Sequence, residues 1–123
     1  MPYKRIILEM GAGNDLYGED YTKAACRAVQ DALHHSSLSL FKTLGLDRGA
    51  MQVEVTIGVQ EPTQIDTQAV ASQVPFGSVT VVTKTGGLNV ADVDPQQVSV
   101  IAVASIAVRL DLPEGKFVIS EDA

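Results

Sequence analysis

Lys84 and Ser105 are the side chains whose types could carry a reaction. Lys84 ends an apolar run and comes shortly before Gly86 and Gly87. An ammonium there can bind a ligand anion or, when desolvated and neutral, act as a base toward Ser105 or Ser78. The other interpretation is a charge on an edge strand that discourages pairing with other chains. Both interpretations stay open, and the enzyme hypothesis is limited to hydrolysis by a serine and a lysine.

A glycine-rich stretch near the N-terminus is the second candidate site. Gly11 and Gly13 follow an apolar run, and Asp15, Glu19 and Asp20 precede an alanine-rich segment. The order resembles a dinucleotide-binding loop, but a leucine holds the third glycine position and the carboxylates would repel a pyrophosphate. We therefore predict a tight loop whose carboxylates stabilise a helix start, with ligand contacts from Gly11, Gly13, Asp15 and Asp20 as a further expectation. Binding of Mg²⁺ or Ca²⁺ is the minor alternative because regular ligand spacing is missing, and we predict no metal and no cofactor.

Arginine, histidine and cysteine are the other side-chain types that could bind a ligand or react. Arg109 is a cation within an apolar strand that can bind a carboxylate or amide carbonyl, or pair with Glu54 or Asp111. The adjacent His34 and His35 would point about 100° apart on a helix, so they do not converge on one ion. Cys26 falls beside an apolar helical stripe, which predicts a buried and inert thiol.

Composition limits the partners and the compartment. The chain has 123 residues, 46% of them hydrophobic, and a formal net charge of −6. This size predicts a single α+β domain over residues 1–123. The negative charge argues against nucleic acid and anionic membranes, which bind basic surfaces. One cysteine cannot form an internal disulfide, and no apolar run approaches the ~20 residues of a membrane span, so we expect a cytoplasmic protein.

Hydrophobic periodicity predicts the elements that must position these side chains. Alternation predicts strands over residues 3–10, 51–59, 78–85 and 98–110, and apolar spacing predicts a helix over about 20–35. A second helix is expected to start at Asp66 as its N-cap and to end at Pro75 and Gly77. Residues 38–44 suggest a helical turn, 89–97 a loop and 117–120 a short edge strand. The order strand-helix-strand-helix-strand-strand predicts an α+β fold with a four-stranded mixed sheet and both helices on one face.

The last long strand has an additional consequence for assembly. Residues 98–110 are largely apolar at both parities. Because two helices can cover only one face of a small sheet, the other face must be covered too, most simply by another copy of the chain. We therefore predict a homotrimer or higher homo-oligomer.

Several longer segments resemble an uncharacterised family of small bacterial proteins known by a Listeria hypothetical protein. They are Glu9-Met-Gly-Ala-Gly13, Asp15-Leu-Tyr-Gly-Glu-Asp20, Val53-Glu-Val-Thr-Ile-Gly-Val59, Pro75-Phe-Gly77 and Gly86-Gly-Leu88. The resemblance covers most of the chain. It implies a fold similar to trimers with chorismate-mutase-like or RidA-like sheets.

A more distant resemblance concerns the cyanuric acid hydrolase and barbiturase group. Val82-Thr-Lys84-Thr-Gly-Gly87 is similar to the lysine segment in one repeat of those ring-opening amidohydrolases. The resemblance implies that a homotrimer could rebuild their threefold site, with Lys84 as base and Ser105 as nucleophile.

Two function hypotheses follow from these observations. The first is a small-molecule site at subunit boundaries that hydrolyses a cyclic amide, with ligand contacts from Gly11, Gly13, Asp15, Asp20, Gly86, Gly87 and Arg109. The alternative is a non-catalytic homo-oligomeric binding or scaffold protein in which the same residues are structural.

Overall fold

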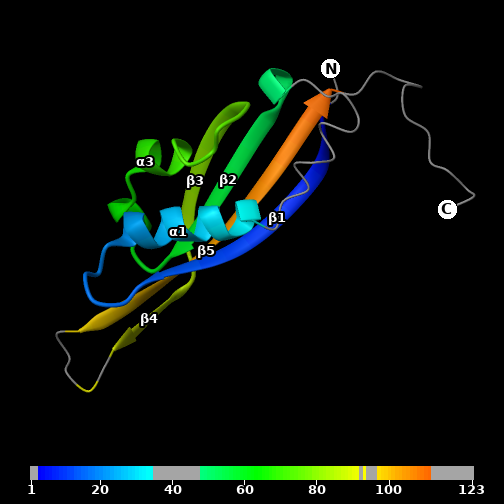
Figure 1. Cartoon of the computed structure of the whole chain (residues 1–123). Helices are drawn as coiled ribbons and strands as arrows, with labels where there is room; N and C mark the ends of the chain where they lie inside the picture. Colours follow the sequence, from blue (N-terminus) through cyan, green and yellow to red (C-terminus); the bar gives the residue numbers. More distant parts are fainter. Residues whose placement is uncertain (1–2, 35–47, 92, 94–96, 112–123) are drawn as a thin grey trace, which may run out of the picture.

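The computed structural model describes residues 3–34, 48–91, 93 and 97–111 (Figure 1). The predicted turn over 38–44 and edge strand over 117–120 lie outside these ranges. The elements are β1 (Tyr3–Asp15), α1 (Tyr21–His34), η1 (Arg48–Ala50), β2 (Gln52–Val59), η2 (Pro62–Gln64), α3 (Thr67–Ala71), β3 (Ser78–Thr85), β4 (Leu88–Ala91) and β5 (Val98–Asp111). This is an α+β protein, as predicted.

One mixed sheet contains five strands rather than the predicted four. Its order is β1-β5-β2-β3, with β4 paired to β5, and only β2 and β3 run parallel. The missed strand is β4, which pairs with β5 where a polar loop was expected. β4 has only four residues, all of them exposed, so it is too short for its alternation to stand out beside the polar residues that follow.

The glycine-rich stretch is also strand where a loop was predicted. β1 continues through Gly11 and Gly13 and ends at Asp15, paired with β5 except at a bulge between Arg5 and Ile7. A Cβ on Gly11 would lie 2.6 Å from the backbone oxygen of Ala28, and one on Gly13 would lie 2.6 Å from that of Ala24. The two glycines therefore let the alanine-rich face of α1 rest directly on the backbone of β1.

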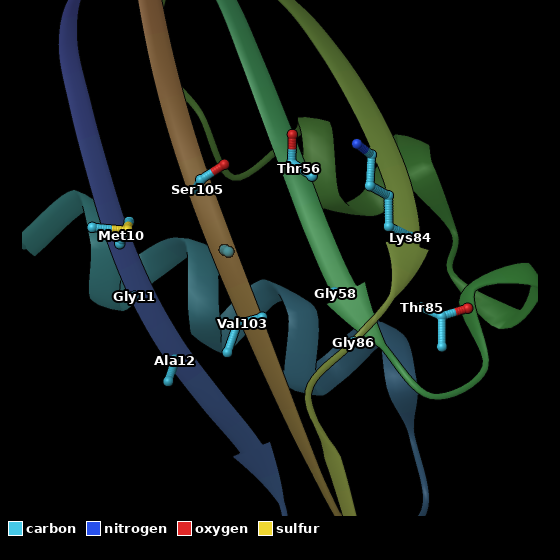
Figure 2. Close-up of a pocket in the computed structure, with 11 residues that line it drawn as sticks. Met10, Gly11, Ala12, Thr56, Gly58, Lys84, Thr85, Gly86, Val103 and Ser105 are labelled. Carbon is cyan, nitrogen blue, oxygen red and sulfur yellow. The ribbon is translucent and has the colours of Figure 1, made fainter.

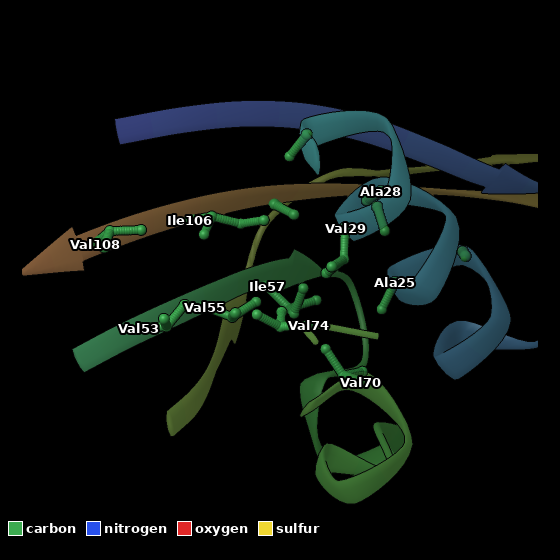
Figure 3. Close-up of a cluster of buried hydrophobic side chains, with 14 of the residues drawn as sticks. Ala25, Ala28, Val29, Val53, Val55, Ile57, Val70, Val74, Ile106 and Val108 are labelled. Carbon is green, nitrogen blue, oxygen red and sulfur yellow. The ribbon is translucent and has the colours of Figure 1, made fainter. Parts of the chain in front are cut away.

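Aliphatic side chains fill the space between the helices and the sheet (Figure 3). The buried set includes Val53, Val55, Ile57 and Val59 from β2, Ile106 and Val108 from β5, Val29 from α1 and Val70 from α3. The buried residues of β2 alternate along the strand, as the pattern over residues 51–59 predicts. Asp66 caps α3 as predicted, because its side chain accepts bonds from the backbone N–H groups of Gln68 and Ala69. The helix ends at Ala71, earlier than Pro75.

The connection from β3 to β4 crosses the end of β2, and three glycines lie at the crossing. The chain leaves the side of β2 at Gly86, passes the end of β2 at Gly58, and joins β5 through Gly87. Gly87 has φ of +61°, and a Cβ on it would lie 2.9 Å from the Gly58 oxygen. Because L side chains rarely adopt that φ, glycine is required at this position.

The opposite face of the sheet has no helix over it among the described elements (Figure 1). We call it the open face. It carries exposed apolar side chains, including Leu8, Met10, Val103 and Leu88. In β1 the residue facing the core is Ile7, whereas Leu8 and Met10 point to the open face. None of the helices in the described ranges is long and apolar enough to cross a membrane.

Candidate functional site

Rows of side chains cross the open face, because partners in neighbouring strands point to the same side of a sheet. Four rows run from β1 through β5 and β2 to β3. They are Arg5–Arg109–Gln52–Ser78, Leu8–Ala107–Glu54–Thr80, Met10–Ser105–Thr56–Val82 and Ala12–Val103–Gly58–Lys84. In the first two rows the residues from β2 and β3 are polar. The rows of Ser105 and Val103 surround a hollow.

That hollow is a groove of about 590 Å³ on the open face (Figure 2). It is lined by Met10, Gly11, Ala12, Thr56, Gly58, Lys84, Thr85, Gly86, Val103, Ala104 and Ser105. The buried Gly58 lies between Val103 and Lys84 in its row, and a Cβ there would lie 2.9 Å from Cγ2 of Val103. The absence of a side chain at Gly58 therefore lets Cγ2 of Val103 lie close to the β2 backbone.

Lys84 and Ser105 both line this groove, together with the predicted ligand residues Gly11 and Gly86. Figure 2 shows the Lys84 side chain extending along the sheet toward the row of Thr56 and Ser105. From the register, the Cα atoms of Lys84 and Ser105 lie two strands and one row apart, or about 12 Å. The contacts of the described residues contain no hydrogen bond between the two side chains.

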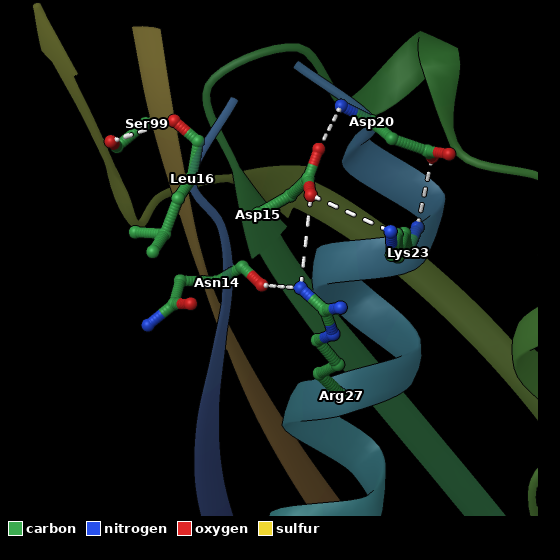
Figure 4. Close-up of polar contacts among 7 residues, drawn as sticks. All are labelled: Asn14, Asp15, Leu16, Asp20, Lys23, Arg27 and Ser99. Carbon is green, nitrogen blue, oxygen red and sulfur yellow. Dashed lines mark hydrogen bonds and ion pairs between the residues drawn. The ribbon is translucent and has the colours of Figure 1, made fainter. Parts of the chain in front are cut away.

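Asp15 and Asp20 lie outside the groove, where they hold the start of α1 (Figure 4). The Asp15 carboxylate, 6% exposed, accepts a 3.0 Å bond from the Asp20 N–H and lies 3.7 Å from the Arg27 guanidinium and 3.9 Å from the Lys23 ammonium. Arg27 also donates to the Asn14 carbonyl at 2.7 Å, and the Asp20 carboxylate accepts from the Lys23 N–H at 3.0 Å. These contacts support the predicted helix-start role of the carboxylates.

The remaining ligand candidates are also outside the groove. Gly13 faces α1, and Gly87 makes the chain crossing. Arg109 lies in the first row, four residues along β5 from the groove residue Ser105, which corresponds to about 13 Å. It lines a separate pocket of about 260 Å³ with Gln52, Glu54, Ser78 and Thr80.

Cys26 is half-buried between α1 and α3. Its thiol donates a weak bond to the Ala69 carbonyl, with 3.8 Å between sulfur and oxygen. Burial raises the pKa of this thiol, and the nearby carboxylates of Asp20 and Asp66 raise it further. A thiol with a raised pKa is a poor nucleophile at neutral pH, which agrees with the prediction of an inert cysteine.

Within the described ranges, no group of three or more histidine, cysteine, aspartate or glutamate side chains could hold a metal ion. The acidic residues before α1 instead contact backbone N–H groups and basic side chains.

The family comparison covers the strands that form the open face and the helix α1 behind them. A family model described as "Conserved hypothetical protein (Lin0512_fam)" matches residues 5–108. The chain belongs to this family. The resemblance drawn from the N-terminal and central segments is confirmed.

The chain is also similar to a solved structure, an FtsZ-like protein of unknown function from Nostoc punctiforme PCC 73102. The two share 32% sequence identity with a TM-score of 0.79, over 91% of this chain and 99% of that one. Among curated proteins, no sequence matches this chain.

Sequence reasoning missed the residues that join Lys84 to Ser105 across the sheet. Thr56 is the direct neighbour of Ser105 in the β2–β5 ladder, and Met10 is its neighbour in β1. The alternation of apolar and polar residues places Thr56 and Met10 on the open face, but the order and register of the strands decide which side chains are neighbours there. Strand order and register cannot be predicted from one sequence.

Proposed function

We propose that this protein is a homo-oligomer that binds a small molecule in the open-face groove, at a boundary between subunits. The observation that carries the proposal is the groove itself, which joins an apolar wall to polar groups on a sheet face that no described helix covers. Exposed apolar area of this kind marks interaction sites in water-soluble domains. A trimer with a chorismate-mutase-like or RidA-like sheet is the arrangement we favour.

The groove favours a ligand with an apolar body and a carbonyl or anionic group. Met10 and Val103 supply apolar contacts, and Thr56 and Ser105 supply hydroxyl groups. Lys84 supplies three N–H donors and a positive charge for the ligand's oxygen atoms. Few polar groups on an otherwise apolar lining are typical of small-molecule sites.

Hydrolysis of a cyclic amide is the second candidate, favoured by the presence of Lys84 and Ser105 in one groove. In this reaction the Ser105 Oγ would bond to the amide carbon as its proton passes to Lys84. The C–N bond would break, Lys84 would return the proton to the leaving nitrogen, and water would then cleave the ester and regenerate the serine hydroxyl. Because the two residues are about 12 Å apart at Cα within one chain, we propose that Lys84 of one subunit serves Ser105 of another.

The assembly is tested by placing a charge on the open face. V103E would bury a carboxylate in the apolar contact, which costs several kcal/mol, and we expect it to sediment as the 13.0 kDa chain. V93E is the matched control, since Val93 is 99% exposed and lies outside the strands. Wild type and V93E should sediment at a multiple of that mass. A wild-type monomer would contradict the assembly.

The ligand site is tested with barbituric and cyanuric acids as probes, by calorimetry and by assaying ring opening. We expect K84M to weaken binding about tenfold or more, because it removes a charged hydrogen bond, and S105A to abolish ring opening while binding persists. G58A, which narrows the groove without touching either residue, should weaken binding alone. If wild type binds the probes without opening their rings, the hydrolysis hypothesis is wrong and the protein is a non-catalytic binding protein. Unchanged binding in both K84M and G58A would reject the groove as the site.

A further inference from the structure

Two arginines lie side by side at the end of the open face that is far from the groove. Arg5 of β1 is the direct ladder partner of Arg109 of β5. Directly opposed like charges destabilise a sheet, typically by a few tenths to 1 kcal/mol. A negative charge bound between them would offset this repulsion.

Neither guanidinium has a protein partner among the described contacts. The two ion pairs found in the described ranges both belong to Asp15, and no hydrogen bond there involves Arg5 or Arg109. Two carboxylates share this end of the face: Glu54 is one row away on β2, and Asp111 is two residues along β5. Neither of them lies within 4.0 Å of a guanidinium nitrogen in the described structure.

The surroundings of Arg109 provide further donors. The pocket of about 260 Å³ beside it is lined by the hydroxyl groups of Ser78 and Thr80 and by the Gln52 amide. Arg109 is half-buried and stands in a central strand, so its position is held by ladders on both sides. Guanidinium groups bind the paired oxygens of carboxylates and phosphates through two parallel hydrogen bonds.

We propose that Arg109 forms an oxyanion site with Gln52, Ser78 and Thr80, for a small molecule that carries a phosphate or a carboxylate, and that Arg5, beside Arg109 on β1, adds positive charge next to it. The bound anion would neutralise the opposed guanidinium groups, and the hydroxyl and amide groups would donate to its remaining oxygens. Glu54, at the edge of the pocket, disfavours a second negative charge on the ligand near β2.

This site is independent of the proposed function, because Arg109 lies about 13 Å along β5 from Ser105, the nearest groove residue on that strand, and the two pockets share no lining residue. Loss of Lys84 therefore affects the groove alone, and loss of Arg109 affects the oxyanion site alone. The two hypotheses can fail separately.

The experiment titrates inorganic phosphate and, separately, acetate into the full chain at constant ionic strength, with calorimetry as the readout. We expect wild type and the control K23Q, which removes an ammonium near Asp15, to bind with equal affinity, and R109Q to bind about tenfold or more weakly. Tighter binding of phosphate than acetate assigns the site to phosphate-bearing ligands, and the reverse assigns it to carboxylates. Equal affinity in wild type and R109Q, or no binding of either anion, overturns the proposal.

Thermal unfolding supplies a second readout that does not depend on affinity. Without an anion, R5Q should unfold at a higher temperature than wild type, because it removes the opposed like charges. With saturating phosphate the wild-type midpoint should rise, and R109Q should not respond. If R109Q instead lowers the sedimenting mass and phosphate has no effect on wild type, the arginine pairs with a carboxylate of a second copy and the proposal is wrong.

Discussion

Gly13 sets the distance between β1 and α1, and this role gives a residue-scale prediction. An alanine Cβ at this position would lie 2.6 Å from the Ala24 carbonyl oxygen, a backbone atom of a packed helix. Because the contacted atoms belong to the helix backbone, no change of rotamer can relieve the clash, and we expect G13A to lower the free energy of unfolding by about 3 kcal/mol or more. Urea denaturation of wild type and G13A measures this difference in free energy.

G58A is the matched control for that substitution. Its new Cβ would meet Cγ2 of Val103 at 2.9 Å, the end of an exposed side chain that can change rotamer. We expect its effect to stay below about 1 kcal/mol. Equal losses in G13A and G58A would show that close helix packing does not explain Gly13.

Cys26 supplies a prediction on reactivity and pH. Its thiol pKa is raised by burial and then by the carboxylates of Asp20 and Asp66, so the thiolate fraction at neutral pH is small and alkylation by iodoacetamide should be slow. D66N keeps an N-cap oxygen on α3 but removes its charge. The thiol pKa should therefore fall, and alkylation at a fixed pH should become faster.

The control for the cysteine measurement is E54Q, which removes a carboxylate from the opposite face of the sheet. Its alkylation rate should equal that of wild type. A D66N rate that is also unchanged would mean that the charge of Asp66 does not contribute to the reactivity of Cys26.

At the scale of elements, the crossing between β3 and β4 depends on one backbone conformation. Gly87 has φ of +61°, and its neighbours are the backbone oxygens of Ile101 and Gly58. We expect G87A to release β4 from β5, because alanine is strained at this φ and its Cβ would contact both oxygens. Hydrogen exchange should then lose protection at Leu88–Ala91.

The body of the sheet provides the internal reference for that exchange measurement. β2 and β5 pair over Gln52–Gly58 without any contribution from β4, so their protection should persist. Global loss of protection in G87A would show that the crossing is required for the whole sheet.

Elements whose signals are local could be predicted from the sequence, and those decided by distant contacts could not. The alternation of β2 and the Asp66 cap depend on neighbouring residues, and both are confirmed. The continuation of β1 through Gly11 and Gly13 depends on α1 and β5, since glycine alone indicates a turn. The same limit applies to the groove: Lys84 and Ser105 stand out by type, whereas Arg5 gains its meaning only from its register with Arg109.

For the whole molecule, the open face links stability to concentration. If the subunits associate through it, folding and assembly are coupled, and the unfolding midpoint should rise with protein concentration. V103E should show a midpoint independent of concentration, and V93E should follow wild type. A constant midpoint in wild type, across concentrations at which it sediments as an oligomer, would show that assembly does not stabilise the fold.

β5 also fixes when this sheet can form during synthesis. It is the partner of β1, β2 and β4, yet it is the last of these strands to leave the ribosome. Until residues 98–111 emerge, β1 has no ladder partner and the described sheet consists of the parallel β2–β3 pair alone. Contacts of such long sequence separation are slow to form. The apolar strands of the nascent chain must therefore wait unpaired, and the period of greatest risk of aggregation ends only with the synthesis of β5.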